Sequence, residues 1–482
     1  MRAVLVAAVL IARLAGSPAF GQERFRRTPP LPDARPVELK LPEVKATVLG
    51  NGLAVAVAEE PRSPSVTLQL VVRAGEADAP RDRPSLAAMT ARMIGKGTKM
   101  LSAEYLDNMV EAMGAEYTVT TLMDYTTLSL RVLPDQLDRA IYVLRVMVLE
   151  AQFPERELAP LRRDVYWELL DRKKDPEVLA WRHLLRVLFE NHPYRTATYA
   201  EDVIKFISAK DVAAFYDRFY RPANAAVLVS GAIDGETAAK KVASHFGAWT
   251  GAPVDRIAVP PPGPNVRDRV CFVEAPDVAN AAVFAGNVIM DATDPDFYPF
   301  LVLKQVLGGT TRSRLFMNLR ESKGYAYYAF SETEFFRACG VYWARALVQP
   351  GTIVPAAREI LREIEALAAG PAEPAEIEEG KSFLIGGLPG RFESAEGFAD
   401  WMARYIALGL DETHWDKGPE RIKLVNVEKV RDVARERLAA RPVVVIVGRP
   451  EWLGPVAEAF GTVEVYDAAG NLARTLRKGE RP

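Results

Sequence analysis

The chain has 482 residues, and its 61 basic and 63 acidic side chains leave a formal net charge of -2. Hydrophobic residues make up 49% and charged residues 26%, which is typical of a globular protein, and the charge balance argues against nucleic-acid binding. The length is too great for a single core and predicts two to four domains. The two cysteines, Cys271 and Cys339, are far apart, so we expect two buried structural thiols rather than a disulfide.

Residues 1–21 have the pattern of a secretory signal peptide. Arg2 precedes the apolar run AVLVAAVLIA, and Ala19–Gly21 forms an A-x-G cleavage site. The apolar run is too short for a good membrane span, although an uncleaved anchor remains the alternative. We therefore expect a periplasmic or secreted protein that is free of the membrane after cleavage. Residues 22–42 are proline-rich and charged, which predicts an extended arm.

From residue 43 to residue 250 the sequence predicts a first domain of alternating strands and helices. Period-two alternation between turn residues indicates the strands, and helical spacing of apolar residues indicates the helices. The expected strands are 46–49, 53–57, 66–72, 225–230 and a pair within 117–132. The expected helices are 85–94, 103–113, 137–149, 155–172, 176–189, 209–219 and 236–246.

A proline-rich linker at 251–268 precedes a second domain at 269–482, in which the order of elements repeats. The expected strands are 270–274, 281–285, those leading to Val348, and 443–447. The expected helices are 297–307, 314–322, 353–367, 375–384, 395–408 and 427–438, with a tail opening at Glu451. This repetition predicts two similar halves of roughly 210 residues. The fold class is α+β, with helices covering antiparallel-rich sheets.

The segment Ser313–Glu332, SRLFMNLRESKGYAYYAFSE, joins a helix to an aromatic strand. Apolar residues repeat at helical spacing up to Gly324 and alternate after it. We expect this turn to bring the guanidinium of Arg320 and the hydroxyl of Tyr327 close enough to contact one ligand. Both groups donate hydrogen bonds and can hold a carbonyl or an oxyanion. Taken without context, a surface arginine and a sheet tyrosine explain the same pattern.

Five blocks of sequence stand in an order that is specific when they are taken together. They are SLAAMTARMIGKGT at 85–98, DYTTLSLRVLPDQLDRAI at 124–141, NHPYR at 191–195, FYRPANAAVLVSGAI at 219–233, and the segment Ser313–Glu332. The chain thereby resembles the pitrilysin/insulinase family of inverted zinc metallopeptidases, particularly short bacterial members similar to mitochondrial processing peptidase. The resemblance implies that the two halves form one side of a clam-like chamber around peptides.

Active members of that family carry H-x-x-E-H on a helix, where two histidines bind zinc and the glutamate activates water. The resemblance places these three positions at Ala88, Ala91 and Arg92, and none of these side chains can do this chemistry. The third ligand, a glutamate in relatives, falls at Leu169. We expect the adjacent Glu168 to face elsewhere, because one helical residue turns a side chain by about 100°. The resemblance therefore implies a chain without its own metal.

The second half keeps the family pattern L-R-E-x-x-G-x-A-Y at Leu319–Tyr327. In active relatives this arginine and tyrosine bind the substrate backbone near the zinc, which implies a substrate-binding role for Arg320 and Tyr327. Some paired bacterial peptidases of the family place the zinc motif on one subunit and the Arg/Tyr pair on the other. The resemblance thus implies a non-catalytic subunit, with zinc held by a partner of the same family that has an intact H-x-x-E-H.

Other interpretations remain open at this point. A scaffold or peptide-binding module without hydrolysis is the main alternative, and a self-sufficient zinc peptidase is a third. Glu379–Ser382 ends like a phosphate-binding loop, but the first glycine of that motif is missing, so a helix surface is the better interpretation. The run Ile385–Gly390 predicts either a hinge or substrate-contacting loop, or a simple break between helices.

Overall fold

The computed structural model describes residues 41–482 except 198–200, 256–260, 412–413, 415–416 and 481–482. The predicted signal peptide and nearly all of the proline-rich arm lie outside the described residues. Residues 41–482 form one compact unit. Within the described part of the chain, no helix is both long enough and apolar enough to cross a membrane.

The first half is built on a six-stranded sheet in the order β1-β2-β6-β3-β5-β4. Its strands are β1 Val44–Val48, β2 Ala54–Glu59, β3 Val66–Val72, β4 Glu116–Thr121, β5 Thr126–Val132 and β6 Ala225–Gly231. Only β2 and β6 run parallel, and the other neighbours are antiparallel. Every residue of β3 and β6 is buried, because both faces of the sheet are covered at its centre.

The second half repeats this topology in a seven-stranded sheet, β13-β12-β7-β11-β8-β10-β9. Its strands are β7 Arg269–Glu274, β8 Ala281–Ile289, β9 Ala326–Phe335, β10 Gly340–Val348, β11 Val443–Gly448, β12 Thr462–Tyr466 and β13 Leu472–Arg477. The late strand β11 pairs parallel with β7 and antiparallel with β8, as β6 does with β2 and β3. The predicted α+β class and the two similar halves are confirmed.

Helices lie on both sheets. The longer helices lie within a few residues of the predicted ranges, whereas the short helices at 201–204, 388–391, 418–423 and 453–460 are not among the predicted elements. In the first half they are α2 Leu86–Met93, α3 Ala103–Glu111, α4 Leu137–Leu149, α5 Glu155–Arg172, α6 Pro176–Leu188, α7 Glu201–Ile204, α8 Ala209–Phe219 and α9 Gly235–Phe246. In the second half they are α10 Phe297–Gly308, α11 Ile353–Ala369, α12 Pro374–Gly386, α13 Leu388–Arg391, α14 Ala395–Leu408, α16 Gly418–Lys423, α17 Val427–Arg437 and α18 Leu453–Phe460.

Two details of the second half differ from the sequence interpretation or refine it. The segment after Glu451 is more than a tail, because α18, β12 and β13 complete the fold and β12 pairs parallel with β7. Val463 and Val465 of β12 are fully buried, which explains why so short a strand is stable there. The run Ile385–Gly390 spans the break between α12 and α13, while Glu379–Ser382 lies within α12.

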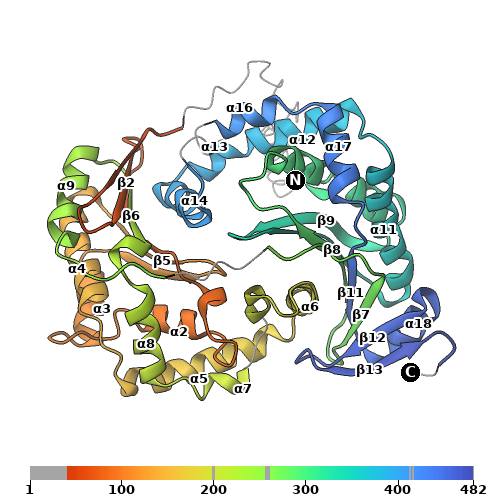
Figure 1. Cartoon of the computed structure of the whole chain (residues 1–482), viewed down its shortest axis with the longest axis horizontal. Coiled ribbons are helices and arrows are strands. Elements are labelled where there is room, and N and C mark those ends of the chain that lie inside the picture. The colour runs from red at the N-terminus through yellow and green to blue at the C-terminus, as the bar shows by residue number, and fades with distance from the viewer. Residues whose placement is uncertain (1–40, 198–200, 256–260, 412–413, 415–416, 481–482) are drawn as a thin grey trace, which may run out of the picture. The chain divides into compact units, whose positions relative to one another are not determined.

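Each half lends one helix to the sheet of the other half (Figure 1). Helix α14 packs on β3 and β6, where its Phe398 and Met402 are buried in one apolar cluster with Leu228. Helix α6 packs on β8 and β11, where its Leu184 is buried in another cluster with Phe284. The opposite face of each sheet is covered by helices of its own half. The two halves therefore share parts of their hydrophobic cores.

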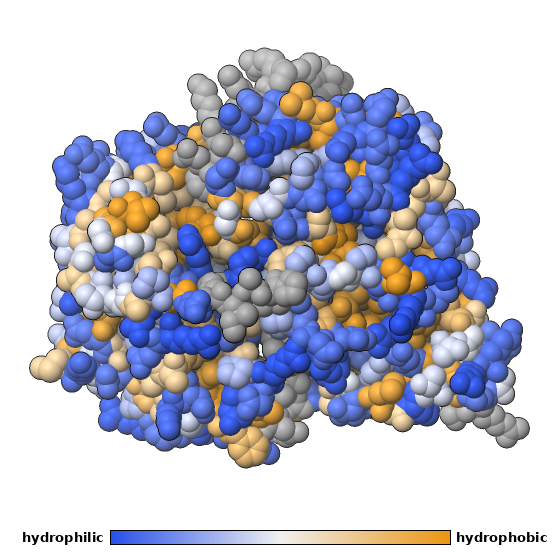
Figure 2. All heavy atoms as spheres, viewed as in Figure 1, coloured by the Kyte–Doolittle hydropathy of each residue, from blue (hydrophilic) through white to orange (hydrophobic). Residues whose placement is uncertain are grey.

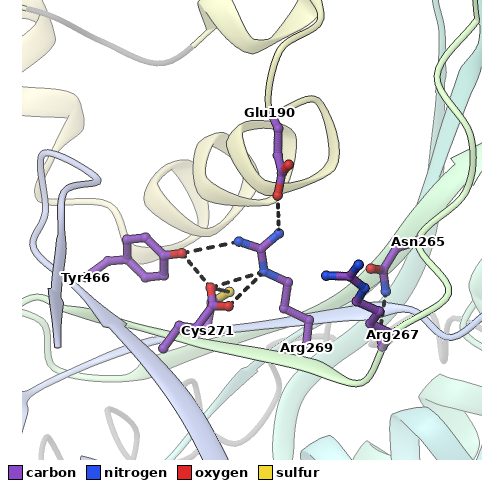
Figure 3. Close-up of polar contacts among 7 residues, drawn as sticks. Glu190, Asn265, Arg267, Arg269, Cys271 and Tyr466 are labelled. Carbon is purple, nitrogen blue, oxygen red and sulfur yellow. Dashed lines mark hydrogen bonds and ion pairs between the residues drawn. The ribbon is translucent and has the colours of Figure 1, made fainter. Parts of the chain in front are cut away.

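Both cysteines are free and buried, as expected. Cys271 lies beside a polar cluster in which Arg269 pairs with Glu190 at 2.7 Å and with Glu464 at 3.1 Å (Figure 3). The Tyr466 hydroxyl donates a hydrogen bond to Glu464 at 2.5 Å. Burial raises the pKa of the Cys271 thiol, so this cysteine stays protonated. The cluster ties the end of α6 to β7 and β12 and has a structural role.

Candidate functional site

A cavity of about 890 Å³ is lined by residues of both halves. Helices α2, α5 and α6 and the edge strand β4 contribute from the first half, and β9 and β10 contribute from the second. Figure 2 shows that hydrophilic side chains cover most of the visible face, with hydrophobic ones in small separate groups. The cavity lined by both halves, rather than an exposed apolar patch, is therefore the candidate site.

Three of the four positions that the family resemblance assigns to the zinc site lie at this cavity. Ala88 and Arg92 on α2 and Leu169 on α5 line its wall, whereas Ala91 is fully buried in the core. Arg92 forms a bidentate ion pair with Glu168, with both nitrogen–oxygen distances at 2.9 Å. The expectation that Glu168 faces elsewhere is wrong, because the long Arg92 side chain and Glu168 meet at the cavity wall beside Leu169.

These side chains do not fit a zinc ion. Alanine has no lone pair to donate, and Arg92 is a permanent cation that would oppose a bound divalent ion. Its hydrogen bonds hold the pKa of Glu168 below the usual range, so this carboxylate is charged and already engaged. Over the described ranges, no group of three or more histidine, cysteine or acidic side chains could hold a metal. No catalytic step through a metal is assigned to this chain.

A half-buried carboxyl group, that of Glu76, lies at the start of α2 in the same cavity wall. Glu76 accepts hydrogen bonds from the backbone N–H groups of Ser85 and Ala88, each at 2.9 Å, and so caps the helix. Ser85 has a left-handed backbone with φ of 67°, which turns the chain into α2. Burial raises the pKa of Glu76 to about 7.

A charged network formed by residues of both halves also lines the cavity. Arg345 on β10 pairs with Glu177 on α6 at 2.6 Å and with Glu332 on β9 at 2.7 Å. The Tyr328 hydroxyl donates a hydrogen bond to Glu177, and the guanidinium of Arg345 lies 5.3 Å from the centre of the Tyr328 ring. This network joins the two halves and gives the cavity a polar side.

Asp124 makes a second connection between the halves and also lines the cavity. It accepts hydrogen bonds from the Tyr194 hydroxyl at 3.1 Å and from the backbone N–H of Arg337 at 2.8 Å. The Tyr194 oxygen accepts in turn from the backbone N–H of Ala338 at 3.1 Å. Asp124 is only 3% exposed, and burial raises its pKa. The sequence blocks contain Asp124 and Tyr194, but sequence alone does not show that they meet.

Arg320 and Tyr327 lie on the surface and do not line the cavity. Arg320 belongs to the π-helical turn Phe316–Ser322, with its guanidinium 4.8 Å from the Phe316 ring centre and 3.7 Å from Glu321. Tyr327 is 53% exposed on β9, the edge strand of the second sheet. In the part of the chain that the structure describes, no hydrogen bond joins Arg320 to Tyr327. Both donors are accessible from outside the chain.

His183 and His192 make structural contacts within this chain. His183 is 3% exposed on α6, and its ring lies 4.2 Å from the Tyr466 ring in an edge-on contact. Burial lowers its pKa to about 3, so it remains neutral. His192 lies directly before Pro193, and its Nδ1 accepts a hydrogen bond from the backbone N–H of Tyr194 at 3.2 Å.

Sequence reasoning missed the acidic and basic residues that the second half contributes to the cavity. Glu332, Glu334 and Arg345 all line it. Period-two alternation in β9 places Glu332 and Glu334 on one face of the strand, and this was the available signal. Helix α6 crosses over to the second half and meets this face of β9. This contact is a tertiary feature, which no local sequence pattern encodes.

Two family models match this chain. The model described as insulinase (peptidase family M16) matches residues 54–202, and the model described as peptidase M16 inactive domain matches residues 207–384. A Streptomyces coelicolor protein named an uncharacterized zinc protease is 26% identical over 420 residues, which cover 84% of this chain and 89% of the relative. Zinc protease PqqE of Helicobacter pylori is 24% identical over 77% of this chain and 86% of its own length.

Two solved structures share the fold. A protease from Helicobacter pylori superposes with a TM-score of 0.80 and 22% identity, covering 85% of this chain and 100% of that chain. A peptidase M16 inactive domain from Pseudomonas fluorescens superposes with a TM-score of 0.77 and 21% identity, covering 84% of this chain and 98% of that chain. Both matches span the two halves together.

Proposed function

Because this chain belongs to the insulinase family of peptidases, peptidase family M16, and its zinc positions do not fit zinc, we propose that it is the non-catalytic subunit of a two-chain zinc endopeptidase. A partner of the same family, with an intact H-x-x-E-H, would hold the zinc and the general base. This chain would hold no zinc, and it would act after export to the periplasm or the medium.

The observation that carries this proposal is the ion pair between Arg92 and Glu168. By the family resemblance, Arg92 occupies the position of a histidine ligand of active relatives, and Glu168 is next to Leu169, the position assigned to the third ligand. An ion pair satisfies its own charges, so this wall needs no metal to be stable. The match of the second half to a family model for an inactive domain also supports a subunit that relies on another chain.

Arg320 and Tyr327 are the residues proposed to act on the substrate. Their exposed side chains, on the edge strand and on the turn before it, can reach a peptide held by a neighbouring chain. Both donate hydrogen bonds, so they can hold the carbonyl oxygen of the scissile bond and stabilise the oxyanion that forms there. The loss of one such donor typically costs on the order of 10²–10³ in kcat.

The test is to purify the chain from its host, identify the family member that co-purifies, and assay each chain alone and mixed. We expect the mixture to hydrolyse peptides far faster than the partner alone, and this chain alone not to hydrolyse them. Arg320→Ala and Tyr327→Phe should lower kcat by about 10²–10³, and Tyr105→Phe, an exposed tyrosine on α3, should not. A mixture no more active than the partner alone, or variants equal to wild type, would refute the proposal.

The second candidate is a peptide-binding module without hydrolysis, and the cavity favours it. Strand β4 is the edge of the first sheet, and its Val119 and Thr121 line the cavity. An extended peptide can add to such an edge as a further strand. If the chain alone binds unfolded peptides and no mixture hydrolyses them, this second function is correct and the first is wrong.

A further inference from the structure

A second pocket, of about 320 Å³, is bounded by α10, α12, α13, α14, α16 and β9 of the second half. Its place in the fold repeats that of the first cavity, because the element order of the two halves is the same. Helices α10 and α12 correspond to α2 and α5, the edge strand β9 corresponds to β4, and the crossing helix α14 corresponds to α6. Glu332, Phe335 and Leu408 line both spaces.

One wall of this pocket is aromatic. Trp401 of α14 packs against Phe392 at 5.0 Å and against Tyr405 at 4.6 Å between ring centres. Phe297 of α10 and Phe335 of β9 pack at 4.8 Å. Such rings offer a large apolar surface to the body of a small ligand. The volume is at the small end of the range of about 300–1,000 Å³ typical of ligand pockets.

The polar side of the pocket carries an excess of positive charge. Lys304 on α10 and Arg391 on α13 line it, and over the described residues neither side chain forms a hydrogen bond or an ion pair. Glu332 is the one carboxylate among the described residues that line the pocket; it is paired with Arg345 at 2.7 Å, and its charge also acts on Lys304. Arg404, a third cation of the wall, pairs with Glu334 at 3.4 Å.

Lys304 differs in this respect from the cation on the corresponding helix of the first half. Arg92 on α2 is neutralised by Glu168 on α5, whereas no acidic side chain from α12 is paired with Lys304. Burial lowers the pKa of Lys304, because its ammonium group is partly removed from water. An anionic group bound beside Lys304 would stabilise its charged form, which burial has deprived of water. The same anion would be attracted by Arg391.

We propose that this pocket binds a small monocarboxylate with an aromatic or alkyl body. Its carboxylate accepts hydrogen bonds from Lys304 and Arg391, and its body packs on Trp401 and the neighbouring rings. The carboxylate belongs either to a free acid or to the C-terminal residue of a peptide, since both present the same chemistry. The site lies within this chain and does not depend on the proposed subunit role.

The experiment is isothermal titration calorimetry of the chain from residue 22 onward. The ligands are 3-phenylpropanoate and 3-phenylpropanamide, which has the same phenyl and alkyl groups but no charge. We expect the acid to bind about tenfold or more tightly than the amide, the difference expected for a hydrogen bond to a charged group. Lys304→Met should weaken binding of the acid by a similar factor and leave binding of the amide unchanged. Lys240→Met, an exposed lysine on α9, is the matched control and should bind like wild type.

A second titration distinguishes a free acid from a peptide C-terminus as the natural ligand. It uses the tripeptide Ala-Ala-Phe with either a free or an amidated C-terminus. Tighter binding of the free tripeptide than of 3-phenylpropanoate identifies a peptide terminus, and weaker binding identifies a free acid. If Lys304→Met does not fold, two measurements still test the proposal. They are the affinity of Arg391→Gln for the acid and the difference in affinity between acid and amide on wild type. Failure of the acid to bind, equal binding of acid and amide, or no effect of both substitutions would overturn the proposal.

Discussion

A single ion pair changes what the first cavity can do. In active relatives the corresponding helix presents neutral imidazoles to a metal, but Arg92 presents a fixed positive charge that Glu168 neutralises at 2.9 Å. Both side chains are partly exposed, so the pair adds little to stability, on the order of 0–1 kcal/mol. Its effect is on chemistry, because both carboxylate oxygens of Glu168 accept hydrogen bonds from Arg92, and the guanidinium has no lone pair to give a metal.

Restoring the family's ligands should restore metal binding if α2 and α5 keep the family's arrangement. The variant Ala88→His/Arg92→His/Leu169→Glu places two imidazoles one helical turn apart, opposite a carboxylate. We expect this variant to retain about one zinc per chain after dialysis, by elemental analysis, and wild type to retain none.

The matched control places the glutamate one position later, as Ala88→His/Arg92→His/Leu170→Glu. That side chain points about 100° away on α5 and should not complete the site. Equal zinc retention by the two variants would show that Glu168, freed from Arg92, serves as the ligand. Stoichiometric zinc in wild type would contradict the assignment of these positions altogether.

At the level of residues, the three positions Ala88, Arg92 and Leu169, which the family resemblance assigns to metal ligands, line one cavity. Their assignment as lost metal positions stays a prediction. The prediction that Glu168 faces away from this site is wrong. It considered only the rotation of Glu168 about the helix axis and not the length of the Arg92 side chain, which reaches it. The roles of Arg320 and Tyr327 stay predictions that the assay of mixed chains decides.

Among the elements, those with strong periodicity were the most predictable. Helix α4 and strand β3 have the bounds that the sequence predicts, because their apolar patterns are long and unbroken. The π-helical turn Phe316–Ser322 was predicted only as a helix, since one extra residue per turn leaves no clear local signature. Strands β12 and β13 were missed because each is short and gains its stability from neighbours distant in sequence.

Helix α14 should contribute strongly to stability through its contact with the first sheet. Phe398 is 2% exposed against that sheet, so Phe398→Ala should lower the free energy of unfolding by about 3–5 kcal/mol, measured by urea denaturation. Trp167→Ala on α5 is the control, because this ring is 62% exposed. Equal losses in the two variants would mean that α14 does not pack on the sheet as described.

Across the whole of residues 41–482, the exchange of α6 and α14 should couple the two halves during unfolding. Removing either half would expose an apolar sheet face and an apolar helix face together, so neither half is expected to be stable without the other. Urea unfolding should therefore give coincident transitions by tryptophan fluorescence and by far-ultraviolet circular dichroism. Two separated transitions would show that the halves unfold independently.

The crossing of α6 and α14 also gives the unit an approximate twofold relation. Each half gives a helix to the other and receives the equivalent helix in return, which is the reciprocity of a domain-swapped homodimer. Here the two copies are joined in one chain through residues 251–268, so concentration no longer limits their association. One copy is then free to diverge from the other, and the two equivalent pockets can acquire different charges while the packing between the copies is kept.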